Sequence, residues 1–177
     1  MNVTEKLKEE HQLILRYIGL LNDYLLAIKK GNSKLVEHLP SFIQFVQEFA
    51  DKYHHGKEEE ILFKVMDEPE VLSHCNPIPQ MQFEHDAGRD YIRNFKSALE
   101  KGDVNLAASN ASGWGALLQE HIGKEDNILY PMGEEGLTDE QKKKILGLYQ
   151  KVEEKFEGAK LEKKFVNLYQ QLKGFLG

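Results

Sequence analysis

The sequence predicts an all-α fold: an up-down-up-down four-helix bundle followed by additional C-terminal helices. Apolar residues recur at three- and four-residue steps over most of the 177-residue chain, which is the period of a helix with one buried face. No alternating apolar–polar run bounded by hairpin turns occurs, so nothing predicts a β-sheet. Four long helical segments joined by short connections favour antiparallel neighbours in a bundle.

The first helix is predicted from Thr4 to about Lys30, and the second from the break at residues 31–33 to about Met66. Thr4 is a candidate N-cap. Pro40 predicts an irregular start to the second helix, because proline is tolerated only in a first turn. The apolar face of the first helix is formed by Leu7, Ile14, Ile18, Leu21 and Leu25.

The third and fourth helices are predicted after a loop from Asp67 to Pro79 that holds three prolines. The third helix covers about residues 80–101. Asp103 is a candidate N-cap for the fourth helix, which is expected to end at about Tyr130, before Pro131.

The C-terminal residues 134–177 are predicted to form a helical extension that packs on the bundle of residues 1–133. Thr138 to Gln141 has the pattern of a capping box that opens a fifth helix. A sixth amphipathic helix is expected from about Leu161 to Leu176. We expect these helices to cover the bundle or to make a homodimer contact.

Composition and charge exclude several classes of protein. A net charge of −6 leaves no basic face of the kind that nucleic-acid binders need. No apolar run approaches the ~18 residues of a membrane span, and the N-terminus lacks the apolar stretch of a signal peptide. Cys75 is the only cysteine, so no intrachain disulfide can form. We therefore expect a cytoplasmic protein without nucleic-acid or membrane partners. Acyl-transfer and phosphoryl-transfer motifs are absent, and no residue is predicted to be catalytic.

One motif occurs twice, at an offset of 67 residues. Its copies are His54-His-Gly-Lys-Glu58-Glu-Glu-Ile-Leu-Phe63 and His121-Ile-Gly-Lys-Glu125-Asp-Asn-Ile-Leu-Tyr130. Histidine and glutamate four residues apart lie on one helix face, so both can reach the bundle centre. The other two helices carry Glu10-His11 and Glu84-His85. The chain therefore alternates a helix with one inward histidine and a helix with a His-x-x-x-Glu pair.

This pattern predicts a metal centre. Imidazole suits iron, zinc or copper, a carboxylate can bridge two metals, and di-iron carboxylate bundles take ligands from all four helices. The candidate ligands are His11, His54, Glu58, His85, His121 and Glu125.

The repeat also contains a lysine and a glycine at matching positions. Lys57 and Lys124 are expected to be solvated or paired with acidic neighbours. Gly56 and Gly123 lie inside helices, where glycine costs about 1 kcal/mol relative to alanine. We interpret both glycines as sites of close helix approach or of a ligand near the backbone.

Taken in this order, the motifs resemble the signatures of the hemerythrin HHE domain, over roughly residues 4–131. The resemblance implies a four-helix bundle with a non-haem di-iron centre, bridged by oxo or hydroxo and held by the six candidate ligands. Zinc or manganese are possible substitutes. The implied partner is a small diatomic or oxidant ligand: O2, NO or peroxide. The pattern is closer to the branch that resembles iron–sulfur repair and nitric-oxide-response proteins than to oxygen carriers.

Two positions depart from the oxygen-carrying hemerythrins. Carriers place a second histidine one turn after the first on the third helix, and here that position is Arg89. Carriers also use aspartate five residues after the last histidine. Asp126 stands there, but the internal repeat favours Glu125.

Three other histidines could replace the absent one. His55 lies about 100° around the helix from His54 and is expected to point away. His38 lies about 24 Å along a continuous helix from His54, which is too far. His74, in the loop before the third helix, could fold back.

Four functions remain open from the sequence. They are a di-iron protein that binds, senses or reacts with O2, NO or peroxide; an iron-storing or iron-donating module for damaged iron–sulfur centres; a structural or sensory domain stabilised by metal; and a bundle without metal.

Overall fold

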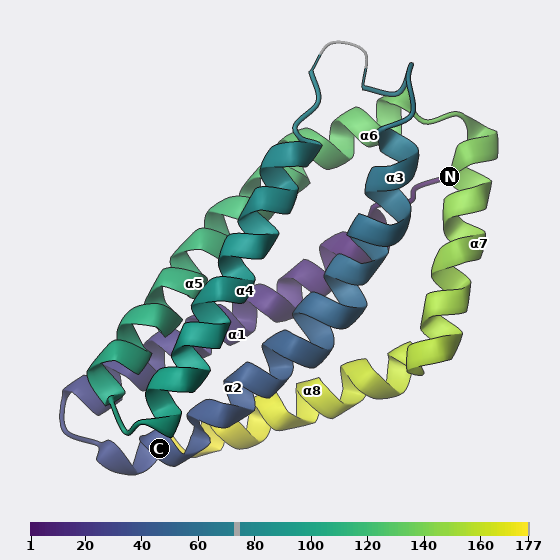
Figure 1. Cartoon of the computed structure of the whole chain (residues 1–177). Coiled ribbons are helices and arrows are strands. Elements are labelled where there is room, and N and C mark those ends of the chain that lie inside the picture. Colours follow the sequence, from purple (N-terminus) through teal and green to yellow (C-terminus); the bar gives the residue numbers. More distant parts are fainter. Residues whose placement is uncertain (73–74, 177) are drawn as a thin grey trace.

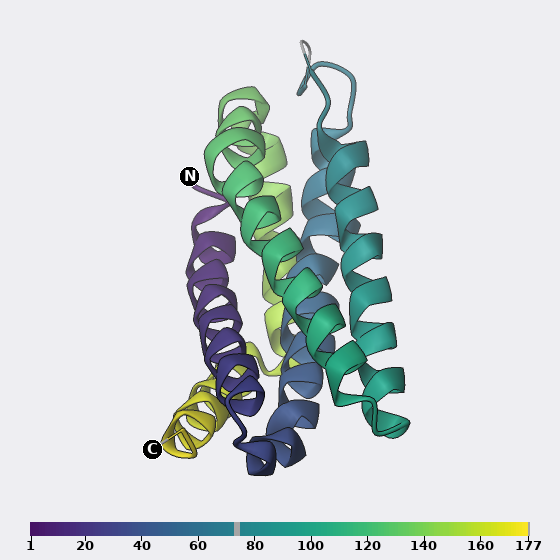
Figure 2. The same ribbon diagram turned by 90° about the vertical axis from the view of Figure 1, so that its left-hand side faces the viewer.

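The computed structural model describes residues 1–72 and 75–176, and it confirms the predicted all-α helical bundle. No β-strand occurs among these residues. Four long helical segments run up and down beside one another (Figures 1 and 2). Within the same residues, no helix combines the length and the apolar character needed to cross a lipid bilayer.

Only two of the four long segments are plain α-helices, namely α1 (Glu5–Lys29) and α4 (Ile78–Glu100). After the 3₁₀ turn η1 (Ser33–His38), the second segment consists of α2 (Leu39–Phe45), η2 (Val46–His55), η3 (Glu58–Leu62) and α3 (Phe63–Met66). The fourth consists of α5 (Val104–Lys124), η4 (Glu125–Leu129) and α6 (Tyr130–Gly136). The segments η2, η3 and η4 are π-helical, a wider winding that is frequent at functional sites.

Two of the helix ends predicted from the sequence are confirmed, and two predictions about helix ends are wrong. The Asp103 side chain accepts a hydrogen bond from the Leu106 amide, and the capping box from Thr138 to Gln141 is present. The Thr4 side chain does not cap α1, because its hydroxyl bonds to Asn2 and Glu134 instead.

The fourth segment does not end at Tyr130, as the sequence predicted. It continues through Pro131 to Gly136. Pro131 falls in the first turn of α6, directly after η4, where the missing N–H of proline is tolerated. The change of winding therefore accommodates the proline.

Two apolar clusters fill the bundle, and a polar layer separates them. Along α1, Leu7 belongs to one cluster and Ile14 to the other, with His11 between them. The same order occurs on the other three segments. The histidines and glutamates of the repeated motifs consequently share one level of the bundle.

The C-terminal helices α7 (Asp139–Phe156) and α8 (Gly158–Gly174) lie against the bundle (Figure 1). The hydroxyls of Tyr17 and Tyr24 each donate a 2.7 Å hydrogen bond to an α8 carbonyl. Phe165 of α8 is fully buried, and its ring packs edge-on against Phe45 at 5.3 Å between centroids. Ile145 and Tyr149 of α7 belong to a core cluster as well, so both helices contribute to the core.

Replacing Phe165 by alanine is expected to lower the free energy of unfolding by about 3–5 kcal/mol, because it removes a fully buried aromatic side chain. Phe83→Ala is the control, since Phe83 is 67% exposed, and its effect should stay within about 0.5 kcal/mol. Urea unfolding of the two metal-free variants measures both. Equal effects would show that α8 does not hold the core together.

Candidate metal centre

All six predicted ligands lie in the polar layer, and each is at most 1% exposed. They come from all four long segments and, together with His55, form two adjacent groups. The first group is His11, His54, Glu58 and Glu125, and the second is His55, His85 and His121. Within each group, one potential ligand atom per residue lies within 4.8 Å of the others.

Each of the two glutamates lies between the groups. The two oxygens of Glu125 are 3.3 Å from His11 Nε2 and 3.2 Å from His121 Nε2. One oxygen of Glu58 is 3.6 Å from Nε2 of both His54 and His85. Both carboxylates therefore contact one histidine of each group, which is the placement of a carboxylate that bridges two metal ions.

The four predicted histidine ligands share a second feature: the Nδ1 atom of each faces a carboxylate on a different segment. The pairs are His11 with Asp126 at 2.8 Å, His54 with Glu10 at 2.9 Å, His85 with Glu59 at 2.7 Å, and His121 with Glu84 at 2.9 Å. A carboxylate at Nδ1 fixes that nitrogen as the donor and leaves Nε2 as the ligand atom. Each ring is thus oriented as a metal-bound histidine is.

The repeated lysines complete these pairs, as salt-bridged residues. Lys57 bonds to Glu10, and Lys124 bonds to Glu84. The two lysines differ in surroundings, because Lys57 is fully buried and also lies 3.2 Å from Glu153 of α7, whereas the Lys124 side chain is 37% exposed. The half of the site around His54 is therefore closed by the C-terminal extension.

Tyr130 closes the first group. Its hydroxyl donates to Glu58 and lies 3.5 Å from His11 Nε2. The sequence showed only that an aromatic residue ends each motif copy. Phe63, at the matching position, has no hydroxyl to donate, so the two halves of the centre are chemically unequal.

The two glutamates also differ in the direction in which their pKa is shifted. Burial, together with the neighbouring Glu125 charge, raises the pKa of Glu58 well above its usual range. Burial acts in the same direction on Glu125, but His121 and His11 outweigh it and hold the pKa of Glu125 well below its usual range. Burial lowers the pKa of His54 and keeps its ring neutral, as a metal ligand requires.

Unsatisfied polar atoms provide a test of whether these residues fit a metal. His54 Nε2, one oxygen of Glu58 and both oxygens of Glu125 are buried without a hydrogen-bond partner. Leaving such atoms unpaired is costly, and few proteins do so without a reason. Imidazole nitrogens and carboxylate oxygens converging in this way are a suitable donor set for a transition metal such as iron. The residues present therefore fit a metal site.

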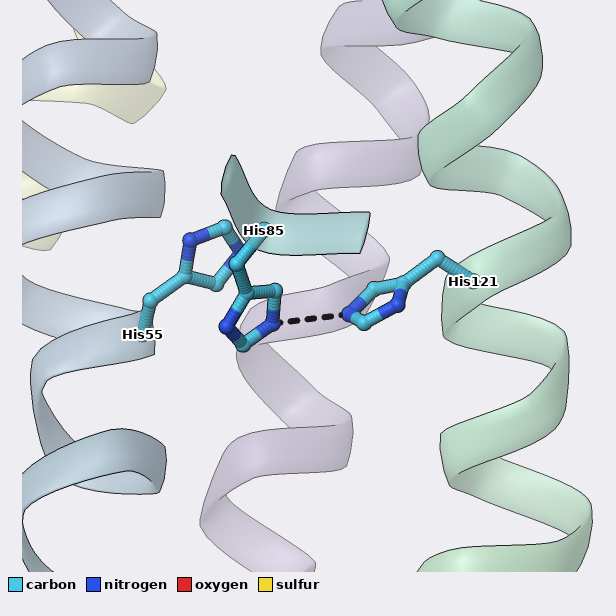
Figure 3. Close-up of side chains that lie close together, drawn as sticks. All are labelled: His55, His85 and His121. Atoms are coloured by element: carbon cyan, nitrogen blue, oxygen red, sulfur yellow. Dashed lines mark hydrogen bonds between the residues drawn. The ribbon is translucent and has the colours of Figure 1, made fainter. Parts of the chain in front are cut away.

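His55 lies inside the site, so the expectation that it points away was wrong. It is 6% exposed, and its ring stacks on that of His85 at 3.8 Å (Figure 3). The reason is that a position about 100° around the segment from His54 still faces a neighbouring segment, here His85 of α4, just as Ile122 is buried beside His121 in the α-helix α5.

The remaining candidates lie elsewhere. Asp126 faces the outer nitrogen of His11, so it is Glu125 that reaches the centre. The His38 ring stacks on Phe175, outside both groups. His74 lies outside the described residues.

Close helix approach does not explain the repeated glycines. A Cβ added at Gly56 or Gly123 would meet nothing within 4 Å. Gly56 directly follows η2 and Gly123 lies two residues before η4, and we have no further physical account of them.

A cavity of about 380 Å³ opens beside the second group. Its lining includes His55, His85, Arg89, Trp114 and Leu118. The second group therefore adjoins an opening large enough for a small ligand, whereas the first is covered.

Glu10→Gln removes the charge behind His54 and is expected to lower metal affinity about 10–100-fold, the usual effect of losing a carboxylate partner. Glu9→Gln is the control, because the neighbouring Glu9 side chain is 63% exposed. Competition with a chromophoric chelator measures both affinities. Equal affinities in the two variants would contradict the role assigned to Glu10.

Comparison with known families identifies the bundle. Residues 2–133 match the family model described as the Hemerythrin HHE cation binding domain. Searches of curated proteins and of solved structures gave no significant match. The matched residues include the whole polar layer and amount to well over half of the chain, so this protein belongs to the hemerythrin HHE cation-binding domain family.

Proposed function

We propose that this protein holds a di-iron centre, bridged by Glu58 and Glu125, that binds, senses or reacts with O2, NO or peroxide. The observation that carries the proposal is the position of the two glutamates, each in contact with one histidine of each group. A single metal ion would need only one group. Two groups joined by two carboxylates match the donor set of a carboxylate-bridged pair.

Iron is the metal best supported by the donor set. The centre offers nitrogen and carboxylate oxygen but no thiolate, and the family to which the chain belongs is described as cation-binding. Iron held in this way supplies redox chemistry and coordination positions open to a small ligand. Manganese and zinc remain possible substitutes.

The surroundings of the second group favour a small ligand. The cavity beside His85 is lined by apolar residues such as Ile92, Trp114 and Leu118, and by charged residues that include Asp51, Arg89 and Lys96. A cavity of this mixed character beside a buried ion can admit a small ligand such as O2, NO or hydrogen peroxide. Ligand entry is thus proposed on the side of the second group.

Burial favours a retained centre over one whose iron is donated. The six ligands are almost completely buried, and four of them are fixed by carboxylates of other segments. Loss of the ions would leave several buried polar atoms unpaired. The iron-donating alternative is tested by transfer of iron from the loaded protein to an apo acceptor, which we expect to be slow.

The first test is metal content and absorption of the aerobically purified protein. About two irons per chain with a near-ultraviolet charge-transfer band are expected, and His54→Ala/His121→Ala should lose both, because it removes one ligand from each group. His38→Ala, a histidine outside both groups, should retain them. A colourless wild-type protein without metal, or a double variant with full iron content, would rule the centre out.

Ligand chemistry is tested on the reduced protein under exclusion of air. Rapid spectral changes on mixing with O2, NO or hydrogen peroxide would support the proposed reactivity. A stable oxygen complex that releases O2 reversibly would instead assign the centre to oxygen carriage. Absence of any reaction, with iron present, would reduce the function to that of a structural ion.

A further inference from the structure

The second group contains a histidine that the resemblance does not assign. His55, His85 and His121 each offer a ligand atom within 4.8 Å of the others, and all three are buried. Figure 3 shows the three rings gathered from three segments, with His85 and His121 pointing toward each other. His55 breaks the internal repeat, because the matching residue in the second copy is Ile122, a buried core residue.

His55 differs from the four expected ligands in the surroundings of its ring. Its Nδ1 lies 3.6 Å from a carboxylate oxygen of Asp51, on the preceding turn of its own segment, which is too far for a hydrogen bond. That nitrogen is buried and has no hydrogen-bond partner. A buried ring nitrogen left unpaired within a group of potential metal ligands calls for a partner, and a metal ion would supply one.

Arg89 occupies the position at which the sequence departs from oxygen carriers, and it also contacts the surroundings of His55. It stands one turn after His85, where oxygen carriers have a second histidine. Its guanidinium bonds to Asp51 at 2.8 Å and to Glu59 at 2.7 Å. These are the carboxylates that face Nδ1 of His55 and His85. Arg89 therefore holds the carboxylate that bonds to His85 and the carboxylate nearest to Nδ1 of His55.

We propose that His55 is a fifth histidine ligand of the centre, bound to the metal ion of the second group, and that Arg89 positions it through Asp51. The inference rests on the proposed di-metal centre. It means that the histidine absent at position 89 is supplied from the second helical segment. Arg89 acts as a positioning residue and does not bind the metal.

The observed stacking of His55 on His85 defines the competing explanation, in which His55 only packs. His55→Ile separates the two explanations. It gives the first motif copy the residue that the second copy already has, and Ile122 shows that isoleucine is accommodated at this depth. Ile122→Ala is the matched control, since it perturbs the same repeat position and removes no candidate ligand.

The experiment is a Co²⁺ titration of the full-length metal-free protein, followed by calorimetry and by visible absorption. The wild type is expected to bind two equivalents. In His55→Ile, one equivalent should weaken at least about tenfold with a changed absorption band, while the other stays unchanged. Ile122→Ala should lower thermal stability but bind both equivalents as the wild type does.

A second variant tests the same point in a different way. His55→Ala leaves a space beside the cavity, so free imidazole should restore the weakened equivalent and its absorption band. The same addition should not affect His55→Ile, in which that space is filled. Restoration in His55→Ala supports the proposal even if His55→Ile does not fold.

The outcomes separate the two proposals. A wild type that binds no Co²⁺ overturns the di-metal centre itself. Two equivalents in the wild type, with unchanged affinity and absorption in both His55 variants, overturn only the role of His55. Arg89→Met should reproduce a weaker form of the His55→Ile effect, and wild-type affinities in that variant would overturn the positioning role.

Discussion

Two glutamate carboxyls, Glu58 and Glu125, are completely buried at the centre of the bundle, and the rest of the structure is arranged to make that burial possible. A carboxylate deprived of water needs a compensating charge or hydrogen bonds. The chain surrounds the pair with imidazoles and one tyrosine rather than with arginine or lysine. Imidazole is positive only when protonated, so the compensating charge must come from protons or from metal ions. The buried pair is therefore both a burden on folding and the basis of ion binding.

The carboxylates behind the histidines also connect the bundle. Each of the four hydrogen bonds joins two different segments: first to second, second to third, third to fourth and fourth to first. Together they form a closed ring at one level. A slip of one segment along its neighbours would break two members of the ring at once. The polar layer thus fixes the vertical alignment of helices whose apolar contacts alone are less specific.

Much of the site follows from the sequence, because its ligands obey simple helical spacing. Histidine and glutamate four residues apart share a helix face, so the internal repeat predicted which side chains converge. The carboxylates at Glu10 and Glu84 could have been found in the same way, from their place before a histidine in both helices. What could not be predicted is the winding of η2, since nothing in the local residues distinguishes a π-turn from an α-turn. The wrong orientation of His55 has another cause: a residue next to an inward ligand can still face a neighbouring segment, as Ile122 does beside His121. The fourth segment does not end at Tyr130 because Pro131 follows the π-helical η4 and falls in the first turn of α6, where proline is tolerated.

The contact between Lys57 and Glu153 has a consequence for the order in which the protein matures. Glu153 is synthesised 96 residues after Lys57, in a helix beyond the family match. Until α7 has left the ribosome and docked, the lysine behind Glu10 and His54 lacks one of its two carboxylate partners and its cover from water. The surroundings of His54 are thus completed only after α7 has been synthesised. A nascent chain would bind its ions at full strength only once α7 is in place, which links metal uptake to the synthesis of a helix beyond the family match.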